Sequence, residues 1–225
     1  MENMDSDDEA RRAWMEAEDS CFWEEEPGEP GEEPPAFLPM MFGGIPNVGP
    51  RSHRVLDSEK VCEGHIFDVE KLHVELPDGK RRFYDLVRHG EAVVLVPVTA
   101  DGNILFVRQY RIGAGKEILE VPAGCMNPGE EPLTSAVREL REETGFEAGE
   151  IRRVGGFYMT PGYCTEYLHI YLARELKENP LPQDDDEFIT PISIPVQEAY
   201  RMAENGEFED SKTFAALMMV QQYIR

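Results

Sequence analysis

Residues 124–146 read GCMNPGEEPLTSAVRELREETGF. Apolar residues within this stretch are spaced at i, i+3, i+4 and i+7, which is the period of an amphipathic helix. A proline at position 132 suits the first helical turn, and Gly145 suits the position just after the last one. The stretch therefore predicts a short helix over residues 132–144. Its apolar stripe consists of Leu133, Ala136, Val137 and Leu140.

Three glutamates of this predicted helix, Glu139, Glu142 and Glu143, project from one side, which we expect to lie opposite the apolar stripe. Like charges at this spacing destabilise an isolated helix by a few tenths of a kcal/mol per pair. A hard divalent cation with oxygen ligands would compensate for the repulsion. A solvated acidic helix face is the alternative, and the three carboxylates alone do not decide between the two.

Other residues of the stretch favour the cation. Gly124 precedes the helix through a Pro128-Gly129 turn, so the backbone around Ala123 is free to approach the carboxylates closely. Arg138 has the reach to pair with Glu130 and so to hold the loop against the helix. Loop and helix are therefore predicted to form one unit.

The stretch resembles the Nudix box, G-x5-E-x7-R-E-U-x-E-E-x-G-U, where U is an aliphatic or bulky apolar residue. Every fixed position of that pattern is matched, with Phe146 as the last apolar residue. The resemblance implies an α+β fold, an α/β/α sandwich around a mixed β-sheet, in which the box binds Mg²⁺, with Mn²⁺ as a substitute. The implied metal ligands are Glu139, Glu142, Glu143 and the backbone carbonyl of Ala123, and the implied structural positions are Gly124, Glu130, Arg138 and Gly145.

The resemblance also implies how the reaction runs. The metal would lower the pKa of a water molecule and neutralise charge on the leaving phosphate, with Glu142 and Glu143 as catalytic residues. A general base is expected from the acidic loop at residues 183–187. Glu187 takes that role by its distance from the following Gln197-Glu198-Ala199 segment, and it is also counted among the metal ligands; Asp185 is the alternate.

Residues outside the box resemble the ADP-ribose pyrophosphatase branch of the Nudix family. The segment 120–124 and Pro161, which follows Gly145 by 16 residues, are typical of that branch, although a Pro-Gly pair between two strands is also an ordinary turn. The Gln109-Tyr110-Arg111 segment also resembles this branch, which implies that Arg111 contacts the diphosphate; a planar, always charged guanidinium suits that role, and a surface ion pair is the alternative. The expected substrate-binding residues are Arg111, Tyr84, Arg88, Pro161 and Glu166.

The expected activity is therefore magnesium-dependent hydrolysis of a nucleoside diphosphate linked to a sugar. ADP-ribose, giving AMP and ribose 5-phosphate, is the first choice. GDP-mannose, UDP-glucose or another nucleotide sugar is the nearest alternative. A Nudix-fold ligand sensor or adaptor without catalysis is a second alternative, but the intact box and the lack of a basic helix speak against it.

Outside the box, strands are predicted to dominate up to Gly124, and further strands followed by two helices are predicted after the box. Residues 72–76 and 83–87 flank a Pro77-Asp78-Gly79 turn and predict a hairpin. Residues 92–98 and 104–107 flank Asp101-Gly102 and predict a second, more buried hairpin. Further strands are predicted at 151–159, 166–173 and 188–194, and further helices at 195–204 and 211–224.

Residues 1–50 differ in composition from the Nudix-like domain predicted over residues 51–225. The segment holds 14 acidic residues against two basic ones, which gives a charge of −12 out of −23 for the whole chain. Such a composition predicts a disordered tail, in which Trp14, Phe22 and Trp23 either form a short partner motif or are simply solvated. True initiation near Met40 is the alternative to a functional tail.

Charge and cysteine usage limit the partners. The acidic excess, 45 Asp and Glu against 22 Lys and Arg, repels nucleic acid and anionic membranes, so a small-molecule substrate is expected instead. The spacing of the four cysteines indicates neither a disulfide framework nor a zinc site, which predicts a cytoplasmic protein. The resemblance further implies a homodimer, with residues 60–90 at its interface.

Overall fold

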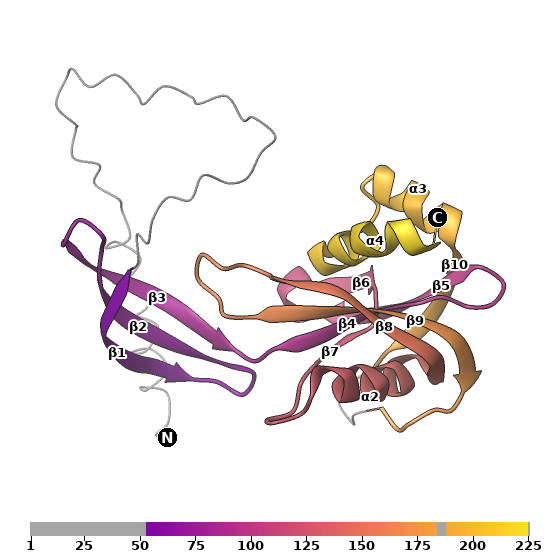
Figure 1. Cartoon of the computed structure of the whole chain (residues 1–225), viewed down its shortest axis with the longest axis horizontal. Helices are drawn as coiled ribbons and strands as arrows, with labels where there is room; N and C mark the ends of the chain where they lie inside the picture. Colours follow the sequence, from indigo (N-terminus) through magenta and orange to yellow (C-terminus); the bar gives the residue numbers. More distant parts are fainter. Residues whose placement is uncertain (1–52, 184–187, 225) are drawn as a thin grey trace, which may run out of the picture. The chain divides into compact units, whose positions relative to one another are not determined.

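The computed structural model describes residues 53–183 and 188–224 (Figure 1). The predicted tail and its aromatic residues, and the acidic residues 184–187, lie outside the described residues. The strands are β1 (Arg54–Glu63), β2 (Phe67–Glu75), β3 (Arg81–His89), β4 (Ala92–Pro97), β5 (Asn103–Arg111), β6 (Lys116–Glu120), β7 (Ala123–Cys125), β8 (Phe146–Tyr158), β9 (Tyr167–Glu178) and β10 (Thr190–Pro195). The helices are a 3-10 turn η1 (Ile112–Ala114), α2 (Pro132–Thr144), α3 (Val196–Glu204) and α4 (Ser211–Ile224).

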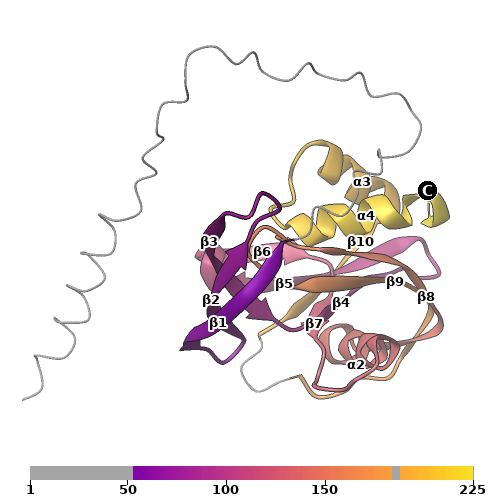
Figure 2. The ribbon, with the colours of Figure 1, turned by 60° about the vertical axis from the view of Figure 1, so that its left-hand side comes forward.

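Within the described residues, the strands form three sheets. The meander β1-β2-β3 forms one sheet, β10-β5-β6 is antiparallel, and β7-β4-β9-β8 is mixed because β4 and β9 run parallel. Helix α2 lies on one side of the strands and helices α3 and α4 on the other, as both views show (Figures 1 and 2). This is the α/β/α sandwich with a mixed sheet that the sequence predicted.

Strand β4 joins the two halves of the core. All six of its residues are buried. Val93 and Leu95 pack in one cluster with Ala136 and Leu140 of α2. The alternate residues of β4 face the other side, because successive side chains of a strand point to opposite faces. There, Ala92, Val94 and Val96 pack with residues of β5, β9, α3 and α4.

The predicted second hairpin is wrong in its pairing, although both of its strands exist. Strand β4 pairs with β7 and β9, whereas β5 pairs with β10 and β6. Each strand therefore has both edges occupied by other partners, and only an isolated bridge between Val98 and Ile104 remains of the hairpin. The Asp101-Gly102 turn does reverse the chain, with the N–H of Thr99 donating to the carbonyl of Asn103 at 2.8 Å, but the two strands then join different sheets.

The first predicted hairpin is confirmed as β2 and β3, paired antiparallel from Phe67–His89 to Glu75–Arg81. Its turn closes through Asp78, whose Oδ1 accepts the backbone N–H of Lys80 at 3.0 Å. The later strands and helices overlap their predicted spans, but β8 begins at Phe146 instead of residue 151 and β9 ends at Glu178 instead of residue 173. Phe188 is exposed and precedes β10, which begins at Thr190.

Helix α2 spans the predicted residues 132–144, with Pro132 in its first turn. Gly145 ends it with φ 80°, a left-handed conformation that glycine adopts without steric cost, and its N–H bonds to the carbonyl of Arg141. None of the helices in the described part of the chain combines the length and apolar character that crossing a membrane requires.

Candidate active site

The face that α2 turns toward the protein carries two of its glutamates. Glu139 is 6% exposed and Glu143 is 2% exposed, whereas Leu133 and Val137 are 49% and 40% exposed. The predicted apolar stripe is therefore wrong in half of its members, since only Ala136 and Leu140 of that set are buried. A solvated acidic face is excluded for Glu139 and Glu143. Ionised carboxylates are costly to bury without partners, so this face needs compensating groups.

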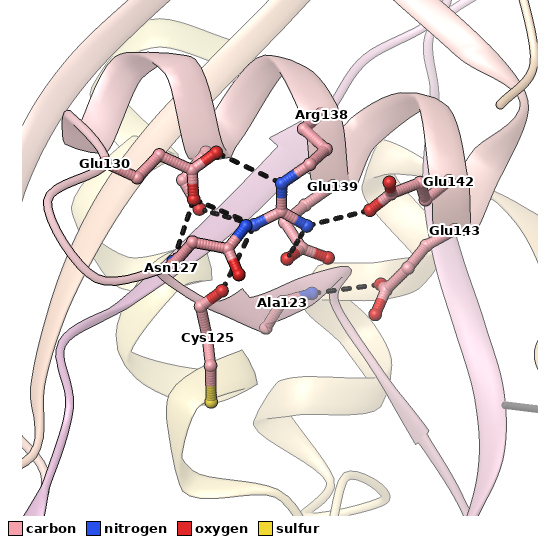
Figure 3. Close-up of polar contacts among 9 residues, drawn as sticks. Ala123, Cys125, Asn127, Glu130, Arg138, Glu139, Glu142 and Glu143 are labelled. Atoms are coloured by element: carbon pink, nitrogen blue, oxygen red, sulfur yellow. Dashed lines mark hydrogen bonds and ion pairs between the residues drawn. The ribbon is translucent and has the colours of Figure 1, made fainter. Parts of the chain in front are cut away.

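Arg138 supplies one compensating group (Figure 3). Its Nε donates to Glu130 at 3.1 Å and its Nη2 donates to the other Glu130 oxygen at 3.0 Å. Its Nη1 donates to Glu139 at 2.6 Å and to Glu142 at 2.8 Å. The predicted Arg138–Glu130 pair is thus confirmed, and the same guanidinium draws the carboxylates of Glu139 and Glu142 toward one positive group.

The backbone of β7 supplies the second. The N–H of Ala123 donates to Oε2 of Glu143 at 3.0 Å (Figure 3). A Cβ at position 124 would collide with the carboxylate of Glu139, so only glycine allows this approach. The expected closeness of backbone and carboxylates is confirmed, and it brings the carbonyl-bearing strand β7 against helix α2.

A cavity of about 280 Å³ adjoins β7. Arg111 and Glu166, both predicted to bind substrate, line it together with Ala123 and Gly124. A larger hollow of about 730 Å³ is lined by other residues, among them Asp101 and Arg174, and none of them belongs to the box. The smaller cavity is the one that brings predicted substrate residues and box residues together.

Arg111 is held by a buried carboxylate. Its Nε and Nη2 donate to the two oxygens of Glu120, at 2.6 and 3.0 Å, and Glu120 is fully buried. Desolvation alone lowers the pKa of Arg111, but the hydrogen bond and charge of Glu120 outweigh it and the pKa is raised. Arg111 therefore stays a fixed positive group at the cavity.

The donor set fits a hard divalent cation. Glu139, Glu142 and Glu143 offer only oxygen, the ligand atom that Mg²⁺ prefers. The convergence of Glu139 and Glu142 on the Arg138 guanidinium shows that the site favours a positive charge. Within residues 53–183 and 188–224, no three acidic, histidine or cysteine side chains already converge as a metal site.

Other predicted residues are not brought to the cavity. Tyr84 lines a separate shallow pocket, and Arg88 pairs with Glu70 of β2 at 2.9 Å. Pro161 lies in a turn in which the N–H of Tyr163 donates to the carbonyl of Thr160 at 3.1 Å, and it does not line the cavity. The expected base Glu187 and its alternate Asp185 lie outside the described residues.

Among the cavity-lining residues that the sequence interpretation missed are the oppositely charged Asp210 and Lys212. They lie at the start of α4, and Oδ2 of Asp210 accepts the backbone N–H of Thr213 at 3.0 Å, as an N-cap residue does. An Asp three residues before a buried Thr was a readable capping signal. Nothing in the local pattern indicated that this helix start lies beside β7.

The Glu130–Arg138 pair gives a pH-dependent stability. The hydrogen bonds from Arg138 lower the pKa of Glu130 from 4.5 to about 2, against desolvation, which raises it. A lowered folded-state pKa contributes stability that is present above the unfolded value and lost as the pH falls toward the folded one. The free-energy gap between wild type and Glu130→Gln is therefore expected to be constant above about pH 5.5, to narrow below pH 4.5 and to close near pH 2.

Urea unfolding of both proteins at a series of pH values measures this gap. Glu131→Gln is the matched control, because Glu131 is the exposed neighbour of Glu130. A gap between wild type and Glu130→Gln that stays constant down to pH 3 would contradict the lowered pKa.

Comparison with known proteins shows which family has this sequence and fold. The profile of the NUDIX domain matches residues 88–217. An ADP-ribose pyrophosphatase of Bacillus subtilis (strain 168) is 36% identical over 170 residues, covering 75% of this chain and 92% of the relative. A GDP-mannose pyrophosphatase of Escherichia coli (strain K12) is 32% identical over 182 residues, covering 74% of this chain and 94% of the relative. The crystal structure of an ADP compounds hydrolase superposes with a TM-score of 0.69 at 29% identity, covering 76% of this chain and 93% of that one.

Proposed function

Because the chain belongs to the Nudix family, we propose that it hydrolyses the diphosphate of a nucleotide sugar: ADP-ribose and water give AMP and ribose 5-phosphate. One observation carries the proposal. Ala123 and Gly124 of β7 line the cavity beside the fixed cation Arg111, and the same two residues contact the buried carboxylates Glu143 and Glu139 of α2. An acidic wall for a cation and a basic group for phosphate are what cleavage of a diphosphate requires.

The proposed metal ligands are Glu139, Glu142, Glu143 and the carbonyl of Ala123, with Mg²⁺ as the resident ion and Mn²⁺ as a substitute. When bound, the ion would lower the pKa of a water molecule and neutralise charge on the leaving phosphate. Glu142 and Glu143 are the proposed catalytic residues within this set. If a cation replaced Arg138 as the partner of Glu139 and Glu142, the two hydrogen bonds from Arg138 to Glu130 would still hold the guanidinium in position.

The protein's own residues bind and orient the substrate. Arg111 donates to the diphosphate from its remaining Nη1, since Nε and Nη2 are held by Glu120. Glu166 lines the same cavity and is proposed to bind substrate there. Pro161, in the turn that precedes Glu166, is likewise proposed to bind substrate. Glu187 is proposed as the general base that takes the proton from water, and as an additional metal ligand, with Asp185 as the alternate.

Tyr84 and Arg88 are proposed to reach substrate in a homodimer. Both belong to the meander β1-β2-β3, which carries exposed apolar side chains such as Val55, Phe67 and Phe83. An exposed apolar sheet favours association with a second copy. A homodimer would bring this meander, and with it Tyr84 and Arg88, to a partner's cavity.

Action in the cytoplasm is also proposed, and it rests on the cysteine composition.

GDP-mannose is the second candidate substrate, because a relative that covers three quarters of this chain is a GDP-mannose pyrophosphatase. The chemistry at the diphosphate would be the same. The two candidates differ in the base and sugar that the cavity accepts.

Purified protein with Mg²⁺ is expected to release AMP from ADP-ribose faster than it cleaves GDP-mannose or UDP-glucose at equal concentration. Product analysis in oxygen-18 water measures substrate and site of attack together, since the label enters the phosphate that water attacks. Turnover of GDP-mannose alone would replace the first substrate by the second. Absence of turnover over the whole panel, with the protein folded and Mg²⁺ present, would contradict the proposed function.

A further inference from the structure

The cavity beside β7 is lined by a second cation, Lys212, from the first turn of α4. Its side chain is 13% exposed. A lysine this far buried is unusual unless carboxylates accompany it. Lys212 is therefore expected to have carboxylate partners.

Lys212 and Arg111 share one buried carboxylate. The Nζ of Lys212 contacts Oε2 of Glu120, to which Arg111 also donates, and Nζ lies 3.0 Å from Oδ1 of Asp210. Two cations and two anions thus form a neutral cluster, which we call the Glu120 cluster: Arg111, Glu120, Asp210 and Lys212. Since Glu120 is fully buried, its charge fixes both cations in place.

The helix start that carries Lys212 is itself anchored beside the box. Thr213 is fully buried and donates its hydroxyl to Asp210 Oδ2 at 2.6 Å. The same hydroxyl oxygen accepts the backbone N–H of Val121 at 3.0 Å. Val121 lies two residues before Ala123, so the position of Lys212 is coupled to the strand that contacts Glu143.

Donor counting leaves Lys212 with unused capacity. A lysine ammonium has three N–H groups. Among the described residues, its contacts are the two carboxylates of Glu120 and Asp210. One N–H therefore remains on a group that lines the cavity. Arg111 also keeps a donor for a ligand, since only its Nε and Nη2 donate to Glu120 and Nη1 does not.

We propose that Lys212 binds a phosphate oxygen of the substrate beside Arg111, and that Glu120 is the positioning residue that holds both cations. This inference rests on the proposed function, since it takes a diphosphate as the ligand. A chain of charge −23 repels such a ligand, and the box adds three glutamates to the site. Two fixed cations at the cavity offset that repulsion where the phosphates bind.

A purely structural role is the competing explanation, in which Lys212 only neutralises Glu120. Kinetics of Lys212→Met test the two. The variant is expected to lose roughly 10- to 100-fold in kcat/KM, mostly through KM, which is the range for one hydrogen bond to a charged group. Lys212→Arg is expected to retain more activity than Lys212→Met. Lys116→Met is the matched control, because Lys116 pairs at 2.7 Å with Glu209 and does not line the cavity.

The Glu120→Gln background separates binding from neutralisation. If Lys212 touches substrate, adding Lys212→Met to Glu120→Gln still raises KM several-fold, because Asp210 continues to hold Lys212 when Glu120 is replaced. If Lys212 serves only to balance Glu120, the double variant matches Glu120→Gln in KM, and the inference is overturned. The double variant leaves no unpaired charge at position 120, so this comparison decides the question even where Lys212→Met alone does not fold.

Calorimetry with the non-cleavable α,β-methylene analogue of ADP-ribose distinguishes failure of this inference from failure of the proposed function. Wild type that binds the analogue without turning over ADP-ribose would refute the hydrolytic activity, while weaker binding by Lys212→Met would still support the phosphate contact. Turnover by wild type together with unchanged binding by Lys212→Met would refute the contact alone. Absence of binding by wild type would overturn both.

Discussion

Replacing Glu143 by Gln is expected to lower kcat by roughly 100- to 1,000-fold and to leave the fold intact. Glu143 is 2% exposed and accepts the N–H of Ala123 at 3.0 Å. A glutamine oxygen can accept the same bond, and the two side chains have nearly the same volume. What the substitution removes is the negative charge, and with it one proposed ligand of the metal.

The size of this effect follows from the work that the site must do. Metal-assisted stabilisation of charge in the transition state is worth several kcal/mol, and each 1.36 kcal/mol is about tenfold in rate. Losing one of several carboxylate ligands forfeits part of that sum, about 3–4 kcal/mol at the stated range. The double variant Glu142→Gln with Glu143→Gln is expected to lose more, because two charges leave the same set.

Steady-state release of AMP measures kcat, and circular dichroism with thermal unfolding reports the fold. Glu131→Gln is the control, since it removes one charge at an exposed position just before α2. A titration of activity with Mg²⁺ adds a second readout, in which Glu143→Gln requires a higher concentration than wild type. Full activity of the Glu142 and Glu143 double variant would show that the metal assignment is wrong.

Local signals explain why α2 was predicted to the residue. Pro132 and Gly145 mark its two ends through backbone geometry alone, without help from the rest of the fold. The Arg138–Glu130 pair was likewise predictable, because eight residues of chain bring the two groups together across one loop and helix. The geometry of the box is therefore determined by residues close together in the sequence.

The errors concern contacts between distant parts of the chain. Strands β4 and β5 are neighbours in sequence, but each finds its partners elsewhere, and turn residues cannot reveal that. The buried face of α2 was misjudged for the same reason. A helical period locates residues on one side, but packing against β4 and the approach of Gly124 decide that Glu139 is buried and Leu133 is exposed. The position of Lys212 at the cavity depends on contacts with residues more than 90 positions earlier in the chain.

Replacing Gly124 by Ala is expected to lower kcat/KM by about 100-fold or more while the domain stays folded. A Cβ at this position would overlap the carboxylate of Glu139. The overlapped atoms are the end of a flexible side chain, so we expect Glu139 to rotate away rather than the strand to move. Glu139 and Glu142 both accept a hydrogen bond from Nη1 of Arg138. The rotation would break the bond to Glu139 and move its carboxylate away from that of Glu142. The predicted loss of activity is thus a loss of ligand alignment.

Stability should respond much less than activity. Inserting one methyl group into a packed site costs about 1–3 kcal/mol, which lowers the melting temperature without unfolding a domain of this size at 25 °C. Gly113→Ala is the matched control, because a Cβ there meets no atom within 4 Å. A crystal structure of Gly124→Ala would show Glu139 turned from its present position. Wild-type kinetics with Glu139 displaced would mean that this glutamate is not a metal ligand.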